Sequence, residues 1–276
     1  MADFLTTKNF GTAIYPIHAN ETSGLLKRCE PFLTPEQLKS RFFKGISLQF
    51  KNGDKFTDSD LKDRINLAMN EAEILLGCVI TREAFKEKIF FDQSLYKAFV
   101  HIQSEHRPII SLEQLAVVSS DNNTVFELPS AWIEASNFSK GLVNVVPLLA
   151  AFGGAQGGSA GMMGGIAFLA VLGQSSFVPA FWQISYTSGL SNKEGNVPVP
   201  VNELIGCVAA IAVLSEIAAT HLYNSQSQSQ DGISQSSSGP GPNIYNKRIE
   251  DLTTKRDEIV RKLKSIFSSR WFVGNF

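Results

Sequence analysis

Residues 201–223, VNELIGCVAAIAVLSEIAATHLY, decide the fold that we expect. From Leu204 to Leu214 this stretch is apolar on nearly all sides of a helix, and Glu203 and Glu216 bracket it. Its uninterrupted apolar span of about 11 residues is too short for the roughly 20 that a bilayer requires. We therefore predict a helix that other parts of the protein bury on most sides.

Two helices are predicted upstream of this one. Residues 33–43, LTPEQLKSRFF, open with a capping-box pattern at Thr34 and Gln37 and a proline at the first helical position. In residues 56–77, FTDSDLKDRINLAMNEAEILLG, Thr57 is the expected N-cap and Gly77 the expected stop. One face of this second helix is apolar: Leu61, Ile65, Ala68, Ala72 and Leu75.

Residues 81–91, TREAFKEKIFF, are predicted to add a further helical piece after a short loop. Near the C-terminus, residues 243–267 predict an amphipathic helix with favourable i,i+4 charge pairs. Its apolar stripe consists of Tyr245, Ile249, Leu252, Ile259, Leu263 and Ile266.

The middle of the chain has the character of β structure. Short β-branched or aromatic runs, separated by Pro, Gly, Asn and Ser, occupy residues 96–103, 112–120, 124–129, 141–149 and 181–189. Residues 225–242, SQSQSQDGISQSSSGPGP, are polar and cannot supply a core, so we expect a linker or an exposed loop there.

These patterns predict an α+β fold, a helical bundle scaffold with an inserted antiparallel β domain and a long Gly-rich apolar loop. The scaffold would comprise residues 30–94 and 198–268. The inserted domain would span 95–197 and carry the loop at 148–178. An N-terminal arm, 1–29, and a C-terminal aromatic tail, 269–276, complete the expected division.

Composition narrows the function classes. A length of 276 residues with 43% hydrophobic and 18% charged residues describes a folded protein with a sizeable core. The net charge of −1 gives no broad electrostatic reason to coat nucleic acid. The three cysteines and four histidines are dispersed and form no zinc or disulfide pattern, so we expect reduced thiols and no metal or cofactor. The first residues show no secretory signal pattern.

The segment Gly153–Gly173, GGAQGGSAGMMGGIAFLAVLG, is unusually long, uncharged and rich in glycine. No charged residue occurs between Lys140 and Lys193. A monomer gains little by exposing such apolar residues to water, and exposed apolar segments of this size mark partner surfaces. We therefore interpret Gly153–Gly173, named here the Gly-rich arm, as a segment that orders against a neighbouring subunit.

Two alternatives stay open for the Gly-rich arm. Glycines recur every four residues from Gly153 to Gly165, a spacing that permits close contact between membrane helices, and the segment would then insert into lipid. Against this, its apolar part has no basic or aromatic anchors. Residues 157–161, GGSAG, also match the G-x-S-x-G elbow of serine hydrolases around Ser159, with His221 and a downstream glutamate as partners. The chain lacks the strand–helix alternation of that fold.

Several segments together resemble the head-to-tail connector (adaptor) proteins of tailed bacteriophages. Residues 56–77 resemble their first long helix, and HRPIISLEQLAVV (106–118) resembles an R-P-I-x-S strand pair. FELPSAWIEASNFSKGLVNVVP (126–147) and FWQISYTSGL (181–190) resemble two β elements that follow in that order. DGISQSSS (231–238) and the charged C-terminal helix complete the pattern over about two thirds of the chain. Residues 148–178 have no counterpart in it.

The resemblance implies a structural virion protein and no enzymatic activity. Family members form rings, often of twelve copies, beneath the portal of the head, and their lumen carries DNA to the tail. The implied partners are further copies of the chain, the portal protein, and tail or neck proteins, with assembly in the host cytoplasm and DNA passing without sequence-specific binding. The near-zero net charge suits a channel wall, because a strongly basic lining would hold DNA by its phosphates.

The expected sites are contact surfaces. In a ring the contacts are head-to-tail, so one subunit's arm meets a different patch on the next. The candidates for subunit contacts are Gly153, Gly157, Gly161, Met162, Met163, Ile166, Phe168, Leu169 and Leu172. The aromatic C-terminus gives the candidates for docking to the portal or a neighbour: Trp271, Phe272 and Phe276.

Overall fold

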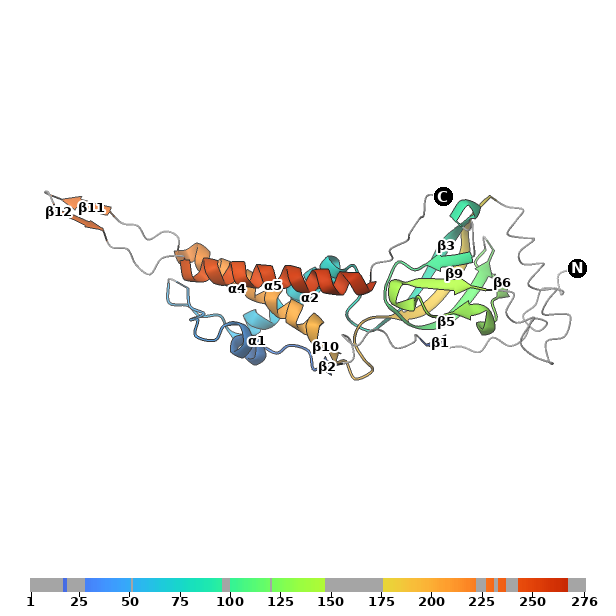
Figure 1. Ribbon diagram of the computed structural model, residues 1–276, viewed down its shortest axis with the longest axis horizontal. Helices are drawn as coiled ribbons and strands as arrows, with labels where there is room; N and C mark the ends of the chain where they lie inside the picture. The colour runs from blue at the N-terminus through green and yellow to red at the C-terminus, as the bar shows by residue number, and fades with distance from the viewer. Residues whose placement is uncertain are drawn as a thin grey trace, which may run out of the picture. The chain divides into compact units, whose positions relative to one another are not determined.

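The computed structural model describes residues 17–18, 28–50, 52–95, 100–119, 121–146, 176–221, 227–230, 233–236 and 243–267. Within them the chain divides into two compact units (Figure 1). The helical unit covers 24–77 and 191–265, and the β unit covers 1–23, 78–190 and 266–276. Helices and antiparallel sheets are segregated, which confirms the predicted α+β class.

The helical unit contains α1 (Pro35–Phe42), α2 (Asp58–Leu76), α4 (Val199–His221) and most of α5 (Asn243–Phe267). The predicted capping box forms at Thr34 with Gln37, and the predicted N-cap Thr57 also forms a capping box, with Asp60. Gly77 ends α2 in the left-handed conformation, with φ 63°, as expected of a C-terminal glycine. Short strands β2 (Cys29–Glu30) and β10 (Val197–Pro198) pair just before α4 begins.

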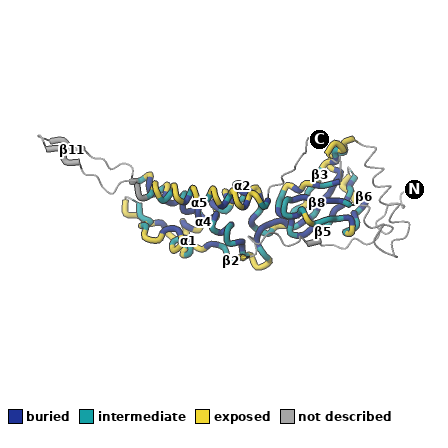
Figure 2. Tube along the Cα trace, in the orientation of Figure 1, coloured by how far each residue is buried: buried dark blue, intermediate teal, exposed yellow. Residues whose placement is uncertain are grey.

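α4 is the buried helix that the sequence predicts. Every residue from Leu204 to Leu214 is buried except Ile211 and Ala212, which are half-buried (Figure 2). By length and composition alone, Val199–Thr220 would suffice to cross a membrane, but 61% of its apolar window is buried within the protein. That burial is typical of a core helix. α2 packs beside α4, and its buried residues are Leu61, Ile65, Ala68, Ala72 and Leu76. The prediction had Leu75 in place of Leu76, but Leu75 is half-buried.

Two close contacts fix α4 within its unit. Asn202 is fully buried, donates through Nδ2 to Glu30 Oε1 at 2.8 Å and to the Pro31 carbonyl at 3.0 Å, and accepts from the Leu33 N–H at 3.0 Å. Gly206 lies against the ring of Phe42 so tightly that a Cβ at this position would be 2.3 Å from two ring carbons. Glycine is therefore required where α1 crosses α4.

The β unit is built from two antiparallel sheets. The larger has the order β1-β5-β9-β3, with β6 also paired to β5, and the smaller has the order β4-β8-β7. The strands of the larger sheet are β1 (Ile17–His18), β3 (Glu83–Asp92), β5 (Ile109–Val118), β6 (Thr124–Glu127) and β9 (Phe177–Ser188). The smaller sheet consists of β4 (Val100–Gln103), β7 (Ile133–Glu134) and β8 (Leu142–Val145).

One core fills the space that the two sheets share. Phe91 of β3, Val143 of β8 and Trp182 of β9 are all buried in a single cluster. Trp132 and Trp182, at 3% and 0% exposure, are core residues. Three single-turn 3-10 helices, Gln93–Leu95, Ser130–Trp132 and Phe138–Lys140, connect the strands.

The predicted helical piece at residues 81–91 is wrong, because residues 83–92 form strand β3. Its residues alternate between the core and solvent, with Phe85, Glu87, Ile89 and Phe91 turned inward and Lys86 and Lys88 exposed. This period of two is that of a strand. β3 pairs with β9 along its length, so residues 78–94 belong to the β unit instead of the helical scaffold. Residues 109–118 likewise form one strand, β5, where the resemblance implies a strand pair.

The polar stretch at residues 225–242 contains regular structure that the sequence interpretation missed. Strand β11 (Ser227–Gln230) pairs antiparallel with β12 (Ile233–Ser236). The strands are separated by Asp231-Gly232, a dipeptide typical of two-residue hairpin turns.

We predict that Gly206→Ala destabilises the helical unit by about 1–3 kcal/mol through overpacking against Phe42. This loss should occur although alanine ordinarily stabilises a helix by about 1 kcal/mol relative to glycine. Urea unfolding followed by far-ultraviolet circular dichroism measures the change. A double-mutant cycle with Phe42→Leu is the control, because the smaller side chain makes room for the new methyl group. Strictly additive effects of the two substitutions would contradict the contact.

Candidate subunit interface

The predicted contact residues of the Gly-rich arm, Gly153 to Leu172, lie outside the described residues. The same holds for the predicted docking residues Trp271, Phe272 and Phe276, and for Ser159 of the hydrolase alternative. Their roles stay predictions.

An exposed aromatic pair stands where the described chain resumes after the arm. Phe177, the first residue of β9, is 57% exposed, and Phe90 of β3 is 47% exposed. Their ring centroids lie 5.7 Å apart, and the adjacent Gln93 N–H donates to the Ser176 carbonyl at 2.9 Å. Here β3 and β9 shift register between Ile89 and Phe91, and Ala180 adopts a positive φ of 49°. The irregular end of this strand pair thus presents two phenyl rings to solvent.

A second exposed apolar surface lies on α2 in the helical unit. Leu67 is 57% and Ile74 81% exposed. Seven residues separate them, so they lie on the same side of the helix, together with Asp63 and Asn70, both exposed. We call these four residues the α2 stripe. A solvated helix normally carries polar residues on this side, so Leu67 and Ile74 are candidates for contact with another protein.

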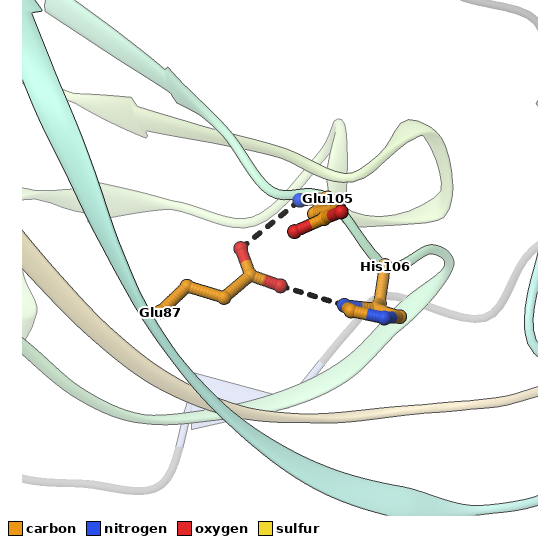
Figure 3. A group of neighbouring side chains, drawn as sticks. All are labelled: Glu87, Glu105 and His106. Carbon is orange, nitrogen blue, oxygen red and sulfur yellow. Dashed lines mark hydrogen bonds and ion pairs between the residues drawn. The ribbon is translucent and has the colours of Figure 1, made fainter.

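A cluster of titratable groups lies in the β unit around Glu87 (Figure 3). Its carboxylate accepts from the Glu105 N–H at 3.0 Å and lies 2.7 Å from Nδ1 of His106. The Tyr186 hydroxyl also donates to Glu87, and it accepts from the His106 N–H at 3.1 Å. Phe85 stacks on the imidazole with ring centroids 3.9 Å apart and an interplanar angle of 9°.

These contacts set the protonation of the cluster. Burial by itself raises the pKa of Glu87, but the hydrogen bonds from Glu105, Tyr186 and His106 outweigh it and hold that pKa below its ordinary value. Burial, reinforced by the hydrogen bond to Glu87, raises the pKa of Tyr186. The glutamate is therefore ionised and the tyrosine neutral at physiological pH.

The cluster also has the residue types of a metal site, since ligand atoms of Glu87, Glu105 and His106 lie within 4.8 Å of one another. Both oxygens of Glu87 already accept hydrogen bonds from protein donors, however. Three hydrogen bonds use most of the roughly four lone-pair positions of this carboxylate, so it has little acceptor capacity left for a cation. The geometry fits a tie between β3, β9 and the β4–β5 loop better than a metal centre. The sequence analysis did not predict this hydrogen-bonded cluster, because Glu87 and Tyr186 are 99 residues apart and form no local motif.

The hydrolase alternative has Glu194, Glu203 and Glu216 as its candidate acidic partners, and two of these form ion pairs elsewhere. Glu216 forms an ion pair with Arg64 at 2.6 Å, and Glu203 forms one with Lys255. The three cysteines are free thiols: Cys29 is exposed, whereas Cys78 and Cys207 are buried. Burial raises the pKa of Cys207 to about 11, so this thiol is protonated at physiological pH.

Comparison with known proteins gives structural neighbours only. No protein-family model matches the chain, and no curated protein matches it. A chain from the neck of an empty gene transfer agent particle, computed with C6 symmetry, has 11% identity and a TM-score of 0.39, with 87% of this chain and 95% of that chain covered. A chain from the virion of a native gene transfer agent particle has 12% identity and a TM-score of 0.39, over 85% and 94%.

A third chain, from the neck of a native particle computed with C12 symmetry, has 12% identity and a TM-score of 0.37, over 82% and 94%. TM-scores of this size do not establish a common fold. The proposals below therefore rest on the residues of this chain.

We predict that Glu87→Gln destabilises the β unit by about 1–3 kcal/mol at neutral pH, because it replaces a charged acceptor of three hydrogen bonds. A carboxyl whose pKa is lowered by folding stabilises the protein above its unfolded pKa of about 4.3, and this contribution is lost as the pH falls through the folded value. The difference between wild type and variant should therefore shrink between about pH 5 and pH 3.

Denaturant unfolding followed by tryptophan fluorescence at neutral and acidic pH measures this difference. Glu83→Gln is the control, because Glu83 is an exposed carboxylate on the same strand. An equal loss of stability at both pH values would contradict the role assigned to the Glu87 charge.

Proposed function

We propose that the chain is a structural protein of a tailed-phage-like particle, which forms a connector ring between the portal of the head and the tail. DNA would pass through the lumen of this ring. The observation that carries the proposal is the chain order of the resembling segments, which fall on α2, then β5, then β6 to β8, then β9. Residues 56–77 and 106–118 enclose α2 and β5 completely, whereas 126–147 begins inside β6 and 181–190 begins inside β9.

Exposed apolar surface supports an assembling protein. The α2 stripe lies on the helical unit and the Phe90–Phe177 pair on the β unit, so each unit carries apolar side chains with no cover. Large residues exposed in this way are typical of protein interfaces. A ring of identical subunits covers two unlike surfaces on each copy, because its contacts are head-to-tail.

Charge supports the same assignment. With 25 Lys and Arg against 26 Asp and Glu, the chain offers no excess of positive charge for gripping DNA phosphates. A channel that lets DNA slide needs such neutrality. We place the protein in the virion, assembled in the host cytoplasm, with twelve copies in the ring and with portal and tail proteins as its neighbours.

The decisive experiment is the mass of the assembled full-length chain. We expect native mass spectrometry and electron microscopy to detect rings, either of the purified chain alone or after it is mixed with the portal protein encoded in the same genome. A chain that stays monomeric in both conditions would refute the proposal.

A matched pair of α2 variants makes this assay specific. Ile74→Lys should lower ring formation by about tenfold or more, because it places a charge in the α2 stripe where a partner would desolvate it. Asn66→Lys adds the same charge to an exposed position about 80° around α2 from Ile74 and should disturb assembly less. Equal behaviour of the two variants would exclude the stripe from the interface.

The proposed role of the Gly-rich arm is tested by deletion of residues 153–173. We expect fewer rings, with the β unit still folded, because the apolar residues of the arm are proposed to cover a neighbouring subunit. A second variant keeps the length but replaces Ile166, Phe168, Leu169, Val171 and Leu172 with serine, which separates apolar contact from loop length. Unchanged assembly in both variants would show that the arm is not a subunit contact.

A further inference from the structure

The hairpin β11–β12 forms a sheet of only two strands. Its register pairs Ser227 with Ser236, Gln228 with Gln235, Ser229 with Ser234 and Gln230 with Ile233. A two-stranded hairpin is marginally stable in water unless one side packs on a core or further strands join it. Contacts within these two strands are therefore not enough to stabilise the hairpin.

The hairpin does not have the composition of a core. Its two strands contain four serines, Ser227, Ser229, Ser234 and Ser236, together with three glutamines and Ile233. Packing of apolar side chains therefore cannot be the main stabilisation, which leaves the backbone groups along the two edges.

The register also identifies the backbone groups that the hairpin leaves unpaired. In a hairpin with a two-residue loop, the pair that flanks the loop exchanges both hydrogen bonds, and such pairs then alternate with pairs that exchange none. Gln230 with Ile233 and Gln228 with Gln235 are thus bonded pairs. The N–H groups of the four serines point outward, toward the edges.

These edges lack the features that normally prevent strand addition. Proteins protect open edges with lysine, proline or bulges. The edge strand β3 of the β unit follows this rule, since Lys86 and Lys88 are exposed along it. In contrast, β11 and β12 contain neither a charged residue nor a proline, and Asp231 is the only charged residue between His221 and Lys247. The hairpin edges are thus open to pairing.

We infer that β12 of one copy pairs antiparallel with β11 of the next copy, so that the hairpins of a ring form one continuous sheet. Both strands have four residues, so each edge is covered along its full length. This pairing repeats the up-and-down order of the hairpin and relates all copies by rotation, as a head-to-tail ring requires. Pairing of β11 with β11 would instead give a twofold dimer with two edges still open. Closure of the ring removes every edge.

This inference rests on the proposed ring, and its test uses the rings from the assembly experiment above. Residue-resolved hydrogen exchange of the full-length chain compares the ring with the unassembled protein. We expect exchange at the four serine amides to slow by about tenfold or more on assembly, because they are bonded only between copies. The amides of Gln228, Gln230, Ile233 and Gln235 are the internal control, since their bonds lie within the hairpin.

A proline scan supplies the second measurement. Ser229→Pro and Ser234→Pro remove outward N–H groups, which proline is suited to do on an edge, and should lower ring yield by about tenfold. Ser229→Ala and Ser234→Ala keep the N–H groups and should assemble as wild type does. Rings that form with unprotected serine amides and tolerate both prolines would overturn the pairing while leaving the connector proposal intact. Absence of rings from the wild-type chain would refute the connector proposal, and this inference with it.

Discussion

The helical unit depends on the burial of one helix. From Leu204 to Leu214, α4 is apolar on nearly every side, so this stretch is stable in water only where protein covers most of it. α1 reaches it through the Gly206–Phe42 contact, and α2 packs on it through its row of small and aliphatic residues. α5 adds the Lys255–Glu203 ion pair, and its Arg248 donates to the Phe42 carbonyl at 3.1 Å. Asn202 then attaches the chain that precedes α1 to the first turn of the same helix.

The β unit is stabilised differently from the helical unit, because its core lies between two sheets instead of around one helix. Trp182 and Tyr186 fill the interior, and Glu87 fixes the Tyr186 hydroxyl and the loop that carries His106. The β3–β9 pairing has no register shift around this tie but is irregular at the far end of the two strands, where Phe90 and Phe177 are exposed. The two units thus differ in architecture but share one property, an apolar surface that the single chain leaves in water.

Local signals predicted the helices well. Thr34, Thr57 and Gly77 specify helix ends through contacts within a few residues, and such contacts survive in any tertiary context. The interpretation failed at residues 81–91, a segment with five charged residues that was predicted to be a helical piece. This segment forms a strand because every second side chain points inward: Phe85, Glu87, Ile89 and Phe91. Each of them contacts residues of β9 or of the core that are distant in the sequence. The β11–β12 hairpin was not predicted because residues 225–242 are polar and lack the β-branched and aromatic residues typical of strands. The Asp231-Gly232 dipeptide is the one local signal of a hairpin turn there. The Glu87 tie joins residues 19 and 99 positions apart, and no pattern of spacing reports contacts of that range.

The distribution of the three cysteines has a practical consequence for studying assembly. Cys78 and Cys207 are enclosed, and Cys207 holds its proton far above neutral pH, so it resists alkylation. Cys29 alone is open to solvent. Cys29 is therefore a single attachment point for a maleimide fluorophore or spin label in the helical unit, and a label there would report distances between copies in the proposed ring without any engineered residue.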